Sequence, residues 1–115
     1  MSRIYEIARR NNIRDPNQLV QAINGLTPIT AFIVGLLARG EFVMGTSDID
    51  MVVIVGGEPP FRARVIGSPL GDVEVVVFTL DEFCRHRMDN NMMLESLRIG
   101  IPIIGDQEEL MKQCK

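Results

Sequence analysis

The sequence predicts an α+β fold in which a small, twisted mixed sheet is backed by helices on one face. The prediction rests on several short runs rich in apolar and β-branched residues, and on helix-capping signals that lie before and after these runs. At 115 residues the chain is long enough for one hydrophobic core and too short for two. We therefore expect a single domain that spans residues 1–115.

Two helices are expected ahead of the sheet. Residues 2–11 place apolar side chains on one side of a helix, with a serine as the cap. A second helix is indicated by Asp15 as its N-cap, Pro16 at its first position and Gly25 just past its end. Both helices are expected to cover the sheet.

Five strands follow from the apolar and alternating runs of the chain. Ile29 to Val34 is a central strand that Gly35 ends, and residues 48–55 form a second buried strand. Residues 61–66 and 72–78 flank a loop rich in glycine and proline, which is typical of a hairpin. A short strand is expected at residues 101–104.

The remaining helices follow the hairpin. Thr79 to Glu82 is a capping box that begins one helix, residues 90–99 form another, and residues 106–114 form the last. The expected order is therefore α-α-β-β-β-β-α-α-β-α. His86 lies between two arginines with no partner visible in the sequence, and we assign it to the surface.

Composition and charge exclude several classes of function. The net charge of −3 argues against broad, sequence-independent binding of nucleic acid, which depends on clustered Lys and Arg. No apolar run approaches the length needed to cross a bilayer, and charged residues interrupt the first ten positions, so we expect neither a membrane segment nor export. Cys84 and Cys114 have no metal-ligand spacing and are interpreted as ordinary thiols in a reducing compartment, the cytoplasm.

Carboxylates lie within two of the predicted strands. Asp48 and Asp50 are one strand repeat apart, so both point to one face at the start of a buried strand. Two such carboxylates repel each other unless a cation lies between them, and Mg²⁺ is usually held by one or two carboxylates together with substrate phosphates. Glu74 lies within an apolar strand, where a carboxylate is costly unless it is paired or bound to metal.

Each of these acids also has a simpler interpretation. Asp48 and Asp50 could be solvated turn residues at the entry of a strand, and Glu74 could face water near the start of its own strand. Asp72 has the same strand parity as Glu74 and is an alternative to it, although its position in the turn makes it the weaker candidate.

Taken together, these motifs resemble a known family. The order of an apolar strand, Gly35, an Ala-Arg-Gly-Glu segment at residues 38–41, a short loop, and Ser-Asp-Ile-Asp at residues 47–50 followed by an apolar strand is similar to the minimal nucleotidyltransferases. These are the small branch of the DNA polymerase β-like nucleotidyltransferase superfamily. The resemblance extends from about Ile29 to Asp106.

The resemblance implies the polymerase β palm-like fold and transfer of a nucleoside monophosphate, most often AMP from ATP, to a hydroxyl acceptor. Asp48 and Asp50 would bind the nucleotide's Mg²⁺ or Mn²⁺, and Glu74 with Asp50 would bind a second ion. The backbone of Gly35 and Leu36 would bind the terminal phosphates. Arg39 could reach a phosphate or be a solvated arginine, and Ser47 could bind a phosphate or act as a cap.

The sequence departs from the family pattern at Leu36, where relatives carry a serine whose hydroxyl meets a phosphate. A hydrogen bond to a charged group contributes about 1.5–3 kcal/mol, so its loss would weaken binding or rate roughly tenfold to a hundredfold. Three hypotheses therefore stay open: an active transferase, an inactive module of the same fold that acts through protein binding, and a structural domain whose acids are surface residues. The resemblance also implies a helical HEPN-type partner, which the chain would neutralise as an antitoxin, or a homo-oligomer that completes the acceptor site.

Overall fold

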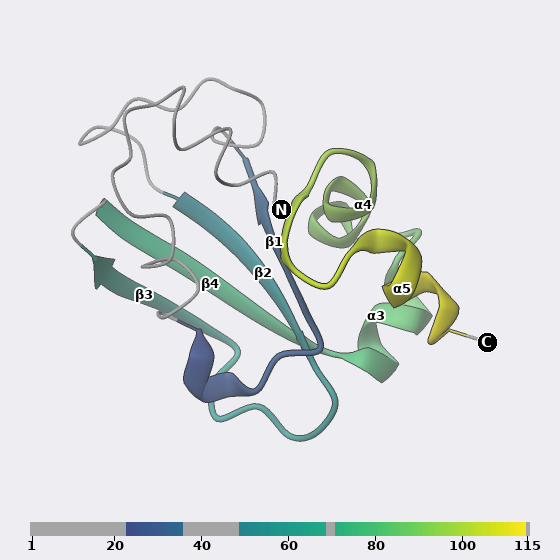
Figure 1. Ribbon diagram of the computed structural model, residues 1–115, viewed down its shortest axis with the longest axis horizontal. Helices are drawn as coiled ribbons and strands as arrows, with labels where there is room; N and C mark the ends of the chain where they lie inside the picture. Colours follow the sequence, from purple (N-terminus) through teal and green to yellow (C-terminus); the bar gives the residue numbers. More distant parts are fainter. Residues whose placement is uncertain (1–22, 36–48, 69–70, 115) are drawn as a thin grey trace.

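The computed structural model describes residues 23–35, 49–68 and 71–114, and these form a five-stranded mixed sheet with helices packed against it (Figure 1). The strand order is β3-β4-β2-β1-β5. The strands are β1 (Thr30–Val34), β2 (Ile49–Val55), β3 (Ala63–Ser68), β4 (Gly71–Thr79) and β5 (Ile101–Ile104). The predicted α+β class and the five predicted strands are confirmed.

Strand β2 lies at the centre of the sheet and differs from the others in how it pairs. It runs antiparallel to β1 and parallel to β4, with a continuous register from Ile49 opposite Val73 to Val55 opposite Thr79. The pairs β3–β4 and β1–β5 are antiparallel. Strand β3 therefore lies at one edge of the sheet, outside β4. After β2 the chain passes the position of β4 to form β3 at the edge, and then turns back to form β4 between β3 and β2.

The helices after the hairpin begin where the sequence predicts, because each has a side chain that caps its first amides. Helix α3 (Leu80–His86) starts with the predicted capping box between Thr79 and Glu82. Asn90 caps α4 (Asn91–Arg98), and Asp106 caps α5 (Gln107–Lys112). Within the described ranges, no helix is long and apolar enough to span a membrane.

Just ahead of β1, the structure has a short 3-10 turn at the place where the second helix was predicted to end. Residues 2–11 and most of the predicted second helix lie outside the described residues. Gly25 was predicted to follow that helix, but it lies inside a short 3-10 turn, η1 (Asn24–Leu26), whose Leu26 N–H donates to the Ile23 carbonyl.

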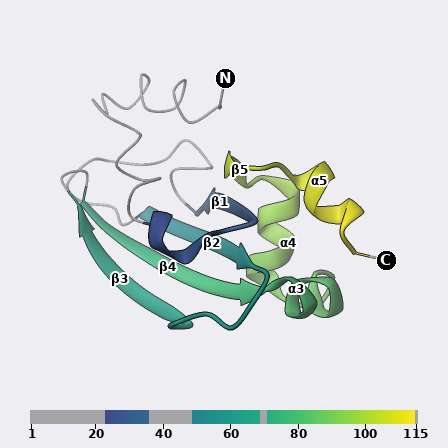
Figure 2. The same ribbon diagram turned by 60° about the horizontal axis from the view of Figure 1, so that its bottom comes forward.

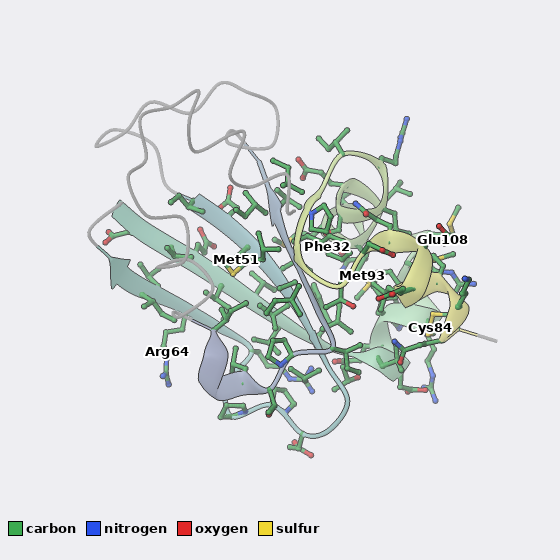
Figure 3. All side chains as sticks on the ribbon, viewed as in Figure 1. Phe32, Met51, Arg64, Cys84, Met93 and Glu108 are labelled. Carbon is green, nitrogen blue, oxygen red and sulfur yellow. A yellow bond between two sulfur atoms is a disulfide. The ribbon has the colours of Figure 1, made fainter. Side chains whose placement is uncertain are left out.

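The two faces of the sheet bury separate sets of side chains, as strand alternation requires. One set faces α3, α4 and α5, which lie on one side of the sheet in Figures 1 and 2. In Figure 3 its members Phe32, on β1, and Met93, on α4, lie in the same region. The other set comprises Ile23, Ala31, Ile33, Ile49, Met51, Val53, Val55, Val73, Val75, Val77 and Ile101.

The hairpin is tighter than the sequence predicted. Gly67, Ser68 and Gly71 were assigned to the connecting loop, but Gly67 pairs with Asp72 and Ser68 pairs with Gly71. The ladder therefore includes the small residues that were taken as loop. Glycine and serine are poor strand formers in isolation, and pairing with β4 overrides that local preference.

The interpretation of Cys84 and Cys114 as free thiols was wrong. Their sulfur atoms form a disulfide that joins α3 to the residues after α5, with Cα atoms 5.3 Å apart (Figure 3). Both cysteines pack against the core cluster beneath these helices. Because disulfides are typical of oxidising compartments, the cysteines no longer support the expected cytoplasmic location.

Reducing this disulfide is expected to destabilise the domain. The crosslink joins residues with a sequence separation of 30. In the chain-entropy model, closing a loop of this size lowers the entropy of the unfolded chain and so raises its free energy by about 3–4 kcal/mol. The free energy of unfolding should therefore fall by about that amount in reductant. Urea denaturation with and without reductant measures the change, and a Cys84→Ser/Cys114→Ser variant should show no response. Two titratable thiols in the unfolded, unreduced protein would contradict the prediction.

The capping box also predicts how stability depends on pH. The Thr79 amide, followed by the Arg62 guanidinium, holds the pKa of Glu82 below its ordinary value of 4.5. A carboxyl whose pKa is depressed by folding stabilises the native state above its unfolded pKa, and this contribution is lost as the pH falls through the folded pKa. The difference in melting temperature between the native protein and Glu82→Gln should therefore shrink in acid. A constant difference down to about pH 3 would contradict this.

Candidate functional site

The parallel register of β2 and β4 brings two of the predicted site residues together. Asp50 on β2 lies opposite Glu74 on β4. Paired residues on neighbouring strands point to the same face, so the two carboxylates are adjacent there. Glu74 is exposed and Asp50 is half-buried. The resemblance implies that these two acids share a metal ion, and the register places them side by side.

These acids lie at the border between a covered and an open part of the sheet. The row of partners that runs across the strands is Val34, Asp50, Glu74 and Val65. Val34 is 2% exposed, because α4 packs over β1, whereas Val65 at the other end of the row is 61% exposed. Asp50 therefore adjoins the helix-covered core, and Glu74 lies where a solute can reach it.

Gly35 lies directly against the Asp50 carboxylate. It follows β1 with a φ of 75°, a conformation that L side chains rarely adopt. A Cβ placed on Gly35 would collide with Oδ2 of Asp50 and lie 3.3 Å from its Cγ. The close approach of this backbone to the carboxylate therefore requires glycine, for both conformation and space.

The amide of Gly35 already has a partner, which the sequence did not reveal. Its N–H donates to Oε1 of Glu95 on α4 at 3.3 Å, across 60 positions of sequence. Glu95 belongs to the helix predicted at residues 90–99. No local signal identifies it, because its relation to Gly35 depends on how α4 packs on β1.

A hollow of about 330 Å³ adjoins this contact on the outer side of α4. Its lining is Asn91, Leu94, Glu95, Arg98 and Ile99. Leu94, an apolar residue of α4, lines this hollow and is half-buried. Glu95 is thus shared between the hollow and the Gly35 amide.

The other predicted site residues cannot be placed. Asp48, Leu36, Arg39 and Ser47 lie outside the described residues. Among the residues that are described, no group of three His, Cys, Asp or Glu side chains is arranged to hold a metal ion. The described part of the site thus holds two carboxylates of the predicted three, and these supply the oxygen donors that Mg²⁺ prefers.

Two arginines in or just before the edge strand β3 have partners other than these acids. Arg64 lies opposite Val75, on the sheet face that carries the other core cluster, and its guanidinium lies 4.3 Å from the centre of the Phe61 ring. Arg62 forms an ion pair with Glu82 on α3. Both arginines are exposed. His86 is exposed too, with Nδ1 3.4 Å from an oxygen of Asp89.

No protein-family model and no curated protein matches the sequence. The resemblance to the minimal nucleotidyltransferases therefore rests on the motifs alone.

Replacing Gly35 with alanine is expected to destabilise the protein and displace Asp50. A non-glycine residue at positive φ costs about 1–3 kcal/mol, and the added Cβ collides with the carboxylate. Gly57→Ala is a matched control, because nothing lies within 4 Å of a Cβ at that position, and its effect should stay within about 0.5 kcal/mol. Chemical denaturation of the two variants measures the difference. Equal effects would contradict the close approach.

Proposed function

We propose that this chain is a metal-dependent nucleotidyltransferase with a polymerase β palm-like fold. It transfers a nucleoside monophosphate, AMP from ATP, to a hydroxyl group of a protein or RNA acceptor. The observation that carries the proposal is the pairing of Asp50 with Glu74 on adjacent parallel strands, beside a glycine whose backbone lies against Asp50. The motif around residues 35–50 supports it from the sequence.

In this proposal the acids hold the metal ions and the glycine backbone faces the phosphates. Asp48 and Asp50 bind the ion that accompanies the triphosphate, and Asp50 with Glu74 binds the second. Bound Mg²⁺ or Mn²⁺ would screen the triphosphate charge and lower the pKa of the acceptor hydroxyl. Arg39 and Ser47 are assigned to the phosphates.

The position of the two described acids suits these roles. Asp50 is held on one side by the backbone of Gly35, which limits the directions its oxygens can take. Glu74 is exposed and opposite Asp50, so an ion can reach both carboxylates from the open part of the sheet. A site that must admit both a nucleotide and an acceptor needs such an open side.

The main alternative is an inactive module of the same fold that acts by binding another protein. Two observations favour it, and both concern the phosphate side of the site. Leu36 supplies no hydroxyl where the resembling family has serine, and a carboxylate oxygen of Glu95 accepts the hydrogen bond of the Gly35 amide. In the proposed site, each of these features would reduce the affinity of the Gly35–Leu36 backbone for phosphate.

We also propose that a partner completes the acceptor site. A HEPN-type protein, which this chain would neutralise as an antitoxin, or a second copy of the chain would fill this role. The exposed Val65, in the same row as Asp50 and Glu74, lies on the open part of the sheet where such a partner has access.

The first test measures binding of ATP with Mg²⁺ through the change in the protein's melting temperature. A ligand that binds the folded state raises the melting temperature, and the rise should need ATP and metal together. Asp50→Asn should abolish it and Glu74→Gln should reduce it, because each removes a charged metal ligand. Transfer of labelled AMP to an acceptor, lost in Asp50→Asn, tests the reaction itself.

Glu58→Gln is the matched control for Glu74→Gln. Glu58 is an exposed acid shortly after β2, beyond the end of that strand opposite to Asp50, and the substitution makes the same change of charge and shape. The control should bind like the native protein. If the two variants behave alike, Glu74 has no special role, and if the native chain does not respond to ATP and metal, the proposed function is wrong.

A further inference from the structure

The Gly35 amide binds an anionic side chain that lies far from it in the sequence. Gly35 is buried, so its N–H needs a partner, and the carboxylate of Glu95 supplies one at 3.3 Å. Any other anion that uses this N–H must displace Glu95. The contact is between an amide at the end of a strand and a side chain of a helix 60 positions later, so it depends on the assembled fold.

We propose that Glu95 is a built-in competitor of the nucleotide phosphates for the Gly35 N–H, and that it sets how tightly the chain binds a triphosphate. This inference rests on the proposed function, since it takes the phosphate side of that site as its subject. Glu95 lowers affinity in two ways: it occupies the donor, and its charge repels a polyphosphate. It is thus an affinity-determining residue on an element that the motif does not include.

The hollow on α4 gives the displaced side chain a place to go. Glu95 and Arg98 both line it, and positions i and i+3 of a helix lie on the same face. Within the described part of the chain, Arg98 has no ion pair, so its guanidinium can receive the carboxylate that leaves Gly35. Displacement then exchanges one partner of Glu95 for another.

Three variants separate the charge of Glu95 from its hydrogen bond. Glu95→Ala removes both, and Glu95→Gln keeps an acceptor oxygen but removes the charge. Glu108→Gln is the control, because it changes the net charge by the same amount on the exposed side of α5, where Glu108 contacts Lys112 at 3.7 Å. Melting temperatures without ligand show that each variant is folded.

Equilibrium binding of ATP and of inorganic triphosphate, each with Mg²⁺, is the test. Glu95→Ala is expected to bind both about tenfold or more tightly than the native chain, since a charged hydrogen bond and a repulsion are both removed. The affinity of Glu95→Gln should lie between those of Glu95→Ala and the native chain, and the affinity of Glu108→Gln should match that of the native chain. Adenosine alone should show no gain in any variant, because it carries no phosphate.

The outcomes separate this inference from the function on which it rests. If Asp50→Asn loses binding that the native chain shows, while the Glu95 variants bind like native, the competition is wrong and the proposed site stands. If neither the native chain nor Glu95→Ala binds triphosphate, both proposals fail. A gain in Glu95→Ala that Glu108→Gln shares would also overturn the inference, since net charge would explain it.

Discussion

The parallel pairing of β2 with β4 is the constraint on which the rest of the site depends. Seven residues of β2 pair with β4 in unbroken register, and β2 is buried at every position except Asp50. A shift by one residue would turn Val73, Val75 and Val77 out of the core and Glu74 into it. The burial of three valines therefore holds Glu74 opposite Asp50, with no contact between the two acids required.

Much of the fold was predictable because its determinants are local. Strand alternation placed Asp50 and Glu74 on the face opposite Met51 and Val75, and the structure bears this out. The capping residues Thr79 and Asp106 start their helices as predicted, because a cap needs only the amides two or three positions ahead.

What the sequence could not predict are contacts set by tertiary packing. The disulfide joins residues 30 positions apart, and neither cysteine has spacing that reveals its partner. The contact between Glu95 and Gly35 spans 60 positions. Periodicity identified the apolar side of α4 but could not say what the other side faces. The α+β class was therefore predictable from local signals, while the contact between Glu95 and Gly35 was not.

Leu36 and Glu95 act on the same part of the proposed site, but in physically different ways. The family that the motifs resemble has serine where this chain has Leu36, and leucine has no hydroxyl, so in the proposed site it would limit the phosphate affinity of every state of the chain. Glu95 is a long side chain with rotatable bonds, and its contact with Gly35 is a single hydrogen bond at 3.3 Å. Such a bond contributes about 1.5–3 kcal/mol at most, an amount that a metal–nucleotide complex can exceed. A site weakened by Leu36 alone is weak under all conditions, whereas one occupied by Glu95 regains its donor as nucleotide concentration rises. The two departures thus do not establish an inactive module, because only one of them is irreversible.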